Sequence, residues 1–262
     1  HQLSDSMVHC IHTLLCGAMG AAEQLRLIPR NPVADVTAPK QKPPPKQILN
    51  DEQLDTFMAA IQADDIWRDF FYTELTTGLR LGEICGLRWE DFDAEHGVLN
   101  IQRTVHVEKG GVLTTGDTKT YAGTRKIVLP ASTVQCLRER KEAALTDWIF
   151  SNPLKPELPV NPRAAYSRLK ALLKDTGLPS IRFHDLRHTF STHALSSGVD
   201  AKTLSGILGH SRASFTLDTY THVTGDMQKR ASEVVGDFLT ELLGKELKPW
   251  QSAENGAAAA ST

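Results

Sequence analysis

Three histidines and one arginine crowd the segment IRFHDLRHTFSTHA, residues 181–194. If this segment is helical, His184 and His188 stand four positions apart on one face, which is the spacing of paired imidazole ligands in zinc enzymes. Arg187 lies on the same face, and its guanidinium would repel a divalent cation, whereas its fork of donors fits phosphate oxygens. The segment alone therefore allows a structural histidine pair, an anion clamp or a metal site, with His193 as a further histidine nearby.

Four more side chains have types suited to phosphate chemistry. Arg80 lies in TTGLRLGE beside Glu83, where a salt-bridged capping residue is the plain alternative. Lys119 lies in GDTKTYAGTRK, in an expected polar turn where a lysine commonly serves only solubility. His210 and Tyr220 occur in ILGHSRASFTLDTY, and the histidine follows a glycine suited to ending a helix. Each residue is weak evidence alone, but their order and spacing along the chain are specific.

The elements that must position these residues follow from periodicity and turn signals. The proline-rich, cationic stretch APKQKPPPKQ, residues 38–47, predicts an extended linker and a domain boundary after a largely helical segment at 3–28. Asn50 is expected to cap a helix over LNDEQLDTFMAAIQ, and the next helix, DIWRDFFYTELTTG, should end at Gly78. A short third helix in RLGEICGLRWEDFD should break near Gly86. Residues 98–130 alternate and contain glycine turns, which predicts three short antiparallel strands.

The remainder of the chain returns to helical patterning, and the sequence therefore predicts a mainly helical domain with a small three-stranded antiparallel sheet. The expected helices are 132–146, 161–176, 184–197, 200–208, 213–221 and 226–247.

Composition describes an ordinary globular protein, with 262 residues, 40% hydrophobic and 23% charged side chains. No apolar run approaches the length of a membrane span, so we expect a cytoplasmic protein with no membrane partner. The first residue is histidine, so a cut or processed amino terminus, and with it an upstream domain, stays open. Four cysteines without any Cys-x-x-Cys spacing argue against a zinc ribbon or a disulfide framework.

The formal net charge of −2 hides an uneven distribution along the chain. Residues 51–95 are strongly acidic, whereas residues 163–188 are basic, so one face could bind a polyanion while another stays acidic. A solvated helix with surface cations is the plain alternative. The candidate DNA-binding residues in the linker and the basic region are Lys40, Lys42, Lys46, Arg163, Arg168, Lys170 and Arg182.

The order of four motifs along the chain resembles the tyrosine recombinase (phage integrase) family. These motifs are TGLRLGEICGLRWEDFD, a lysine in a β-turn, HDLRHTFSTHAL and LGHSRASFTLDTYTHV. The resemblance covers residues 48–238 and implies a helical catalytic domain with a small sheet. It implies that Arg80 and Arg187 bind the scissile phosphate and that Tyr220 is the nucleophile. It also implies catalytic roles for Lys119, His184 and His210, with Glu83 and His188 in support.

The resemblance also implies a domain organisation. Residues 1–37 would be the end of a helical core-binding, DNA-binding domain, and 38–47 the linker. Residues 48–225 would form the catalytic domain, followed by a C-terminal helix at 226–248 and a disordered tail at 249–262. The apolar stripe of that helix would dock on its own domain or on a neighbouring protomer.

The chemistry of phosphodiester cleavage favours the same assignment. The transition state gains negative charge, which two arginines and a lysine can stabilise without a metal or ATP. A tyrosine nucleophile would leave a 3′-phosphotyrosyl ester that retains the free energy of the broken bond, and Lys119 would protonate the leaving 5′ oxygen. His184 and His210 would donate hydrogen bonds or move the tyrosine proton, and Tyr121 is the competing nucleophile.

Three other functions stay open: a type IB topoisomerase, a catalytically silent DNA-binding module, and a histidine-based metallohydrolase. The expected partners are double-stranded DNA at recombination sites, other copies of this chain in a dimer or tetramer, and accessory DNA-bending or directionality factors. The β-strand insertion and the proline linker look most like integrases of mobile elements. The expected activity is therefore site-specific DNA recombination with no cofactor.

Overall fold

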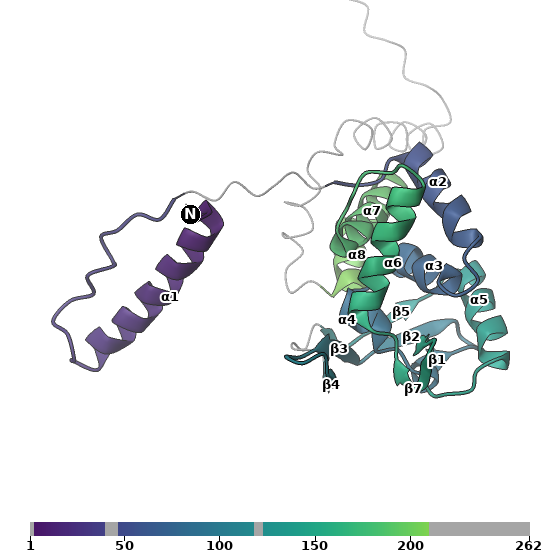
Figure 1. Ribbon diagram of the computed structural model, residues 1–262, viewed down its shortest axis with the longest axis horizontal. Helices are drawn as coiled ribbons and strands as arrows, with labels where there is room; N and C mark the ends of the chain where they lie inside the picture. The colour runs from purple at the N-terminus through teal and green to yellow at the C-terminus, as the bar shows by residue number, and fades with distance from the viewer. Residues whose placement is uncertain (1–2, 40–46, 118–122, 210–262) are drawn as a thin grey trace, which may run out of the picture. The chain divides into compact units, whose positions relative to one another are not determined.

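The computed structural model describes residues 3–39, 47–117 and 123–209, and divides the chain into two compact units between Lys46 and Gln47 (Figure 1). The first unit consists of helix α1, Asp5–Gln24, and the segment after it. The Ser4 hydroxyl caps α1 by accepting the Met7 N–H. The imidazole of His12 contacts the Val36 carbonyl oxygen at 2.7 Å, which holds the following segment against the helix.

In the second unit the helices begin and end close to where the sequence predicts. Asn50 caps α2 with its side chain and forms a capping box with Gln53. Gly78 ends α3 in the left-handed region at φ 59°, as expected of a C-terminal glycine. The helices are α2 Asp51–Gln62, α3 Arg68–Thr77, α4 Leu81–Cys85, the 3₁₀ helix η1 Trp89–Asp91, α5 Ala131–Glu142, α6 Pro162–Asp175, α7 Phe183–Ser196 and α8 Ala201–Leu208.

The described strands form three small antiparallel sheets, drawn in the lower part of this unit in Figure 1. A three-stranded sheet has the order β1-β2-β5, from Phe92–Asp93, Val98–Ile101 and Arg125–Val128. The other two sheets are hairpins. In one, β3 (Arg103–Val107) pairs with β4 (Leu113–Asp117). In the other, β6 (Ser151–Asn152) pairs with β7 (Lys155–Pro159).

The predicted mainly helical domain with a small three-stranded sheet is therefore confirmed, but its strands differ in detail. The short strand β1 completes the sheet, while β3 and β4 form a separate hairpin. The hairpin β6–β7 was not expected, because its prolines and short strands give little alternation. The predicted helices at 213–221 and 226–247, the tail and most of the linker lie outside the described residues.

An aromatic core joins α3 to α7 and so fixes the distance between the two arginine-bearing segments. Phe70 packs edge-to-face on Phe71, Phe150 and Phe183, with ring centroids 5.4, 5.2 and 6.1 Å away. All four rings are buried. Since α3 leads directly into the segment that carries Arg80, this core positions that segment against α7.

The described residues contain no helix long and apolar enough to cross a membrane. The four cysteines are free, and Cys85 is fully buried.

Candidate phosphate-binding site

Arg80 precedes the first turn of α4 and is held there by Glu83. The Glu83 carboxylate accepts the Arg80 backbone N–H at 3.0 Å and the Nη1 donor at 2.6 Å. This is the salt-bridged capping geometry that the sequence allowed. The side chain of Arg80 nevertheless remains 42% exposed, whereas that of Glu83 is 3% exposed. Arg80 therefore presents a fixed and accessible positive charge.

Arg187 lies on the inward face of α7 and is only 1% exposed. Its Nη1 donates to the carbonyl oxygen of Gly78 at 2.8 Å, and its Nη2 donates to that of Leu208. Burial, followed by the positive charge of Arg80, lowers the pKa of Arg187 to about 10, so the guanidinium stays charged at neutral pH. Arg187 has no direct carboxylate partner among the described residues, so its positive charge adds to the site although its guanidinium is covered.

A third arginine, Arg125 at the start of β5, was not expected in the site. Its side chain is 7% exposed and donates to both Glu83 carboxylate oxygens, at 3.2 and 2.9 Å. It also donates to the carbonyl oxygens of Gly123 and Ile207, at 3.1 and 2.6 Å. Strand alternation gave one available signal, because Arg125 shares the inward face of β5 with buried Ile127.

The three arginines meet at the C-terminal end of α8, and we call Arg80, Arg125 and Arg187 the arginine cluster. Arg125 donates to the Ile207 carbonyl, Arg187 to that of Leu208, and Arg80 to that of Gly209 at 3.2 Å. The last carbonyls of a helix lack intrahelical donors and carry the negative end of its dipole, so they attract cations. Three elements distant in sequence are thus joined at three successive residues.

Within the described part of the chain, Glu83 is the carboxylate that contacts the arginine cluster directly. Burial pushes its pKa upward, but hydrogen bonds and charge from Arg125, together with Arg80, hold the pKa below its usual value. Glu83 is therefore ionised at neutral pH and cancels one of three positive charges. The remaining charge suits an anion such as a phosphate group.

The histidines of α7 have separate environments. The rings of His184 and His188 lie edge-to-face with centroids 4.7 Å apart. Although His184 is exposed overall, desolvation by neighbouring atoms and then the charge of Arg187 lower its pKa, so it is neutral at pH 7. His188 is buried. His193 contacts the Leu49 carbonyl at 3.0 Å and Asp51 at 3.3 Å, which ties the start of α2 to α7.

The structure brings together Arg80, Glu83 and Arg187, with His184 and His188 on the same helix as Arg187. Three expected site residues, Lys119, His210 and Tyr220, lie outside the described residues, as does Tyr121.

Most of the expected DNA-binding cations of the second unit already have partners within the protein. Arg168 pairs with Asp64 at 2.7 Å. Arg182 pairs with Asp185 at 2.8 Å at the start of α7. The ammonium of Lys170 donates to the Ser180 hydroxyl and the Ile181 carbonyl, at 2.8 and 2.7 Å. Arg163 is exposed, and Lys40, Lys42 and Lys46 lie outside the described residues.

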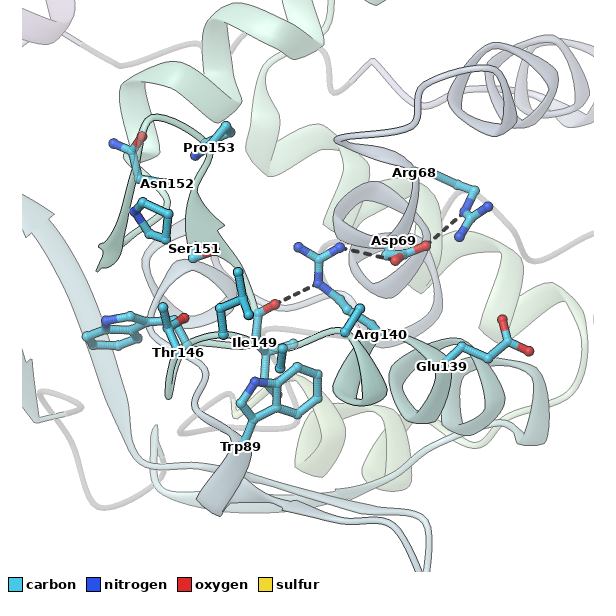
Figure 2. A pocket seen from close by; sticks show the side chains of 15 residues that line it. Arg68, Asp69, Trp89, Glu139, Arg140, Thr146, Ile149, Ser151, Asn152 and Pro153 are labelled. Carbon is cyan, nitrogen blue, oxygen red and sulfur yellow. Dashed lines mark hydrogen bonds and ion pairs between the residues drawn. The ribbon is translucent and has the colours of Figure 1, made fainter.

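A separate pocket of about 420 Å³ lies between the end of α5 and the β6–β7 hairpin, and none of its lining residues belongs to the arginine cluster (Figure 2). Three of its charged side chains pair within the protein: Arg140 donates to Asp69 at 3.2 Å and to the Ile149 carbonyl at 2.7 Å, and Arg68 contacts the other Asp69 oxygen. The described part of the chain contains no group of three or more His, Cys, Asp or Glu residues arranged to hold a metal ion.

Comparison with known proteins gives concordant matches. The model of the Phage integrase family matches residues 47–226. A XerC-like tyrosine recombinase of Caldanaerobacter subterraneus is 30% identical over 73% of this chain and 54% of its own length. The ICEBs1 integrase of Bacillus subtilis is 27% identical over 90% of this chain and 67% of its own length. The chain thus spans about half to two thirds of these relatives.

Among solved structures, the Tn1549 transposon integrase in complex with circular intermediate DNA superposes with a TM-score of 0.74. The two chains are 26% identical, and the match covers 89% of this chain and 81% of that integrase. The fold of the described units is therefore that of a protein solved on DNA.

Proposed function

Because this chain belongs to the phage integrase family, we propose that it is a site-specific recombinase that cleaves and rejoins DNA strands through a tyrosine nucleophile. The observation that carries the proposal is the convergence of three arginines from α4, β5 and α7 on one helix end. Such a cluster can bind a phosphodiester and stabilise the charge that develops on it during cleavage.

Arg80 and Arg187 have different positions relative to an incoming phosphate. Arg80 is accessible and can donate to a non-bridging oxygen without rearrangement. Arg187 lies beneath it with two donors on carbonyls, and it contributes charge from the floor of the site. Because its guanidinium is almost entirely covered, direct contact with a phosphate oxygen requires the residues above it to move aside when DNA binds.

The remaining chemical roles belong to His184 and to three residues outside the described part of the chain. Tyr220 attacks the phosphorus, its oxygen forms the phosphotyrosyl bond at the 3′ side, and the bond to the 5′ oxygen breaks. Lys119 protonates that leaving oxygen. His184, which is neutral, and His210 donate hydrogen bonds or accept the tyrosine proton. No ATP is needed, since the ester bond is exchanged and not hydrolysed.

Trapping of the covalent intermediate tests this mechanism. The chain is incubated with a library of nicked duplexes with randomised cores, in EDTA, and the adduct is digested and mapped by mass spectrometry. We expect the modification on Tyr220, its loss in Tyr220→Phe, and its retention in Tyr166→Phe, which alters an exposed tyrosine of α6. An adduct that persists in Tyr220→Phe would contradict the assignment, and a reaction abolished by EDTA would favour metal-dependent hydrolysis.

The same substrates distinguish recombination from related activities. Once a cleaved sequence is identified, two differently labelled duplexes that carry it are mixed with the chain. A recombinase joins the labels in one product, whereas a type IB topoisomerase relaxes supercoiled DNA without exchange. Binding without any adduct would indicate a catalytically silent module.

For domain organisation, we propose residues 1–37 as the end of a core-binding domain, 38–47 as a DNA-contacting linker, and 48–225 as the catalytic domain. The linker lysines 40, 42 and 46 and the exposed Arg163 would contact the DNA backbone. Because the Tn1549 integrase takes its name from a transposon, we place this chain in a mobile element as well, with accessory DNA-bending or directionality factors as further partners.

We also propose that the C-terminal helix, 226–248, docks on a second copy of the chain. Recombination needs four strands cut, and one nucleophile per chain cuts one strand, so several copies must assemble on DNA. An apolar groove of about 380 Å³ between α2, α3 and α7 can receive the stripe of that helix. Its apolar lining includes Leu54, Met58, Leu75, Phe190 and Ala194.

Sedimentation on DNA of the full chain, of a truncation after Gly225 and of Leu75→Asp tests this docking. We expect both variants to lose assembly while each monomer still binds DNA. Unchanged assembly of the truncated chain would contradict docking between copies.

A further inference from the structure

Glu74 is a buried carboxyl group that the proposed mechanism does not use. It lies on the inward face of α3 and is fully buried. Neither of its carboxyl oxygens has a hydrogen-bond partner within the part of the chain that the structure describes. An ionised carboxylate without hydrogen bonds is costly in a protein interior, so the group must be neutral or compensated by nearby charge.

The charged and titratable groups around Glu74 are those of the phosphate-binding site. Burial raises its pKa well above the usual value, and the positive charges of Arg187 and Arg125 act in the opposite direction. Glu83 raises that pKa further, and Glu74 in turn raises the pKa of Cys85, which is already raised by burial. The neighbours therefore come from α7, β5 and α4.

The backbone also connects Glu74 to Arg187. The Gly78 N–H donates to the Glu74 carbonyl oxygen at 2.8 Å, and the Gly78 carbonyl oxygen accepts from Arg187 at 2.8 Å. Glu74 thus lies one helical turn before the residue that holds the buried guanidinium. Its carboxyl group and a phosphate bound at the arginine cluster would both be stabilised by the same positive charges.

The protonation state of Glu74 changes the charge of the site. The arginine cluster, ionised Glu83 and Glu74 together carry a formal charge of +2 when Glu74 is neutral and of +1 when Glu74 is ionised. A second anion close to a carboxylate disfavours its ionised form. By thermodynamic linkage, a proton that makes anion binding more favourable is itself bound more tightly when the anion is present.

We propose that Glu74 is a proton-binding residue coupled to the phosphate site, so that a phosphate at the arginine cluster and a proton on Glu74 stabilise each other. The proton comes from solvent and returns to it when the phosphate leaves. Glu74 acts through charge on Arg187 and Arg125 and touches no reacting atom. This inference rests on the proposed function only in that the arginine cluster must bind a phosphate-like anion.

NMR of the full chain, labelled with ¹³C at the glutamate carboxyl carbon, tests the coupling. The Glu74 signal is identified by its loss in Glu74→Gln and followed from acidic to alkaline pH. One series contains sodium sulfate and the other sodium chloride at equal ionic strength. Sulfate is a tetrahedral anion that does not titrate in this range, and arginine side-chain signals report whether it binds.

We expect sulfate to move the Glu74 titration midpoint to higher pH. Correspondingly, the affinity for sulfate should fall by up to about tenfold for each unit that the pH rises through the Glu74 titration, because sulfate binding is coupled to the uptake of one proton. Glu74→Gln should lack this dependence, whereas Glu52→Gln, which removes an exposed carboxyl group of α2, should retain it.

An unchanged Glu74 midpoint while the signals of Arg80 and Arg125 respond to sulfate would overturn the coupling and leave the proposed function intact. If no arginine signal responds to sulfate, both the phosphate site and the coupling are wrong. Arg80→Gln provides a further control, since loss of the accessible donor should weaken sulfate binding and the midpoint shift together.

Discussion

Replacement of Arg125 with methionine should destabilise the second unit strongly, although strand alternation is the one signal in the sequence that marks this arginine. The change keeps most of the side-chain volume but removes two hydrogen bonds to Glu83 and those to the Gly123 and Ile207 carbonyls. Arg125 is 7% exposed and Glu83 is 3% exposed, so the carboxylate left behind is buried. Breaking a buried pair on one side costs about 3–5 kcal/mol.

A double-mutant cycle separates the pair from the individual residues. The free energy of unfolding is measured in urea for Arg125→Met, Glu83→Gln and the double variant. Because either single change leaves the other partner unpaired, we expect a coupling energy of about 1.5–3 kcal/mol. Arg125→Lys should recover part of the loss, since one ammonium group cannot reproduce the planar fork of donors.

Arg68→Met is the matched control in the same unit. Arg68 contacts Asp69 at 2.8 Å, but its side chain is 53% exposed, so its loss should cost less than about 1 kcal/mol. Equal losses for Arg68→Met and Arg125→Met would refute the argument from burial. The argument would also be refuted if the losses of Arg125→Met and Glu83→Gln summed to the loss of the double variant within about 0.5 kcal/mol.

Three further measurements follow from the site. Gly78→Ala should lower the free energy of unfolding by about 2–4 kcal/mol, because φ is 59° and a new Cβ would lie 2.4 Å from Phe190. Gly177→Ala, at φ 68° with open space around the new Cβ, should cost only about 1–2 kcal/mol. Equal losses in the two variants would contradict the packing argument. Because burial raises the pKa of Glu74, the folded state binds a proton more tightly than the unfolded state, and the stability gained from this is present at low pH and lost as pH rises towards the folded-state pKa. Relative to Glu74→Gln, the free energy of unfolding of the wild type in urea should fall by up to about 1.4 kcal/mol per pH unit. Parallel pH curves for the two proteins would exclude a raised Glu74 pKa. The His184 ring should titrate by NMR below the usual histidine pKa, and a value above it would contradict the effect of Arg187.

Local signals in the sequence were sufficient to predict most of the helices and strands. The capping box at Asn50 and the left-handed Gly78 depend on interactions within a few residues, so a short window contains their cause. The strand order was less accessible, because β1 has only two residues and pairs with β2 across a turn. The β6–β7 hairpin lacks alternation and was missed for the same kind of reason.

Sequence patterns alone place Arg80 just before a short helix, Glu83 within that helix and Arg187 in a later helix. That Arg80, Arg125 and Arg187 share the end of α8 follows from long-range packing, because their partner carbonyls lie 129, 82 and 21 residues away along the chain. An arginine beside a turn looks like any solvated cation until the surface that buries it is known. Glu74 likewise occupies an apolar helix face, four residues after Phe70, and its significance depends on charges brought to it by other elements.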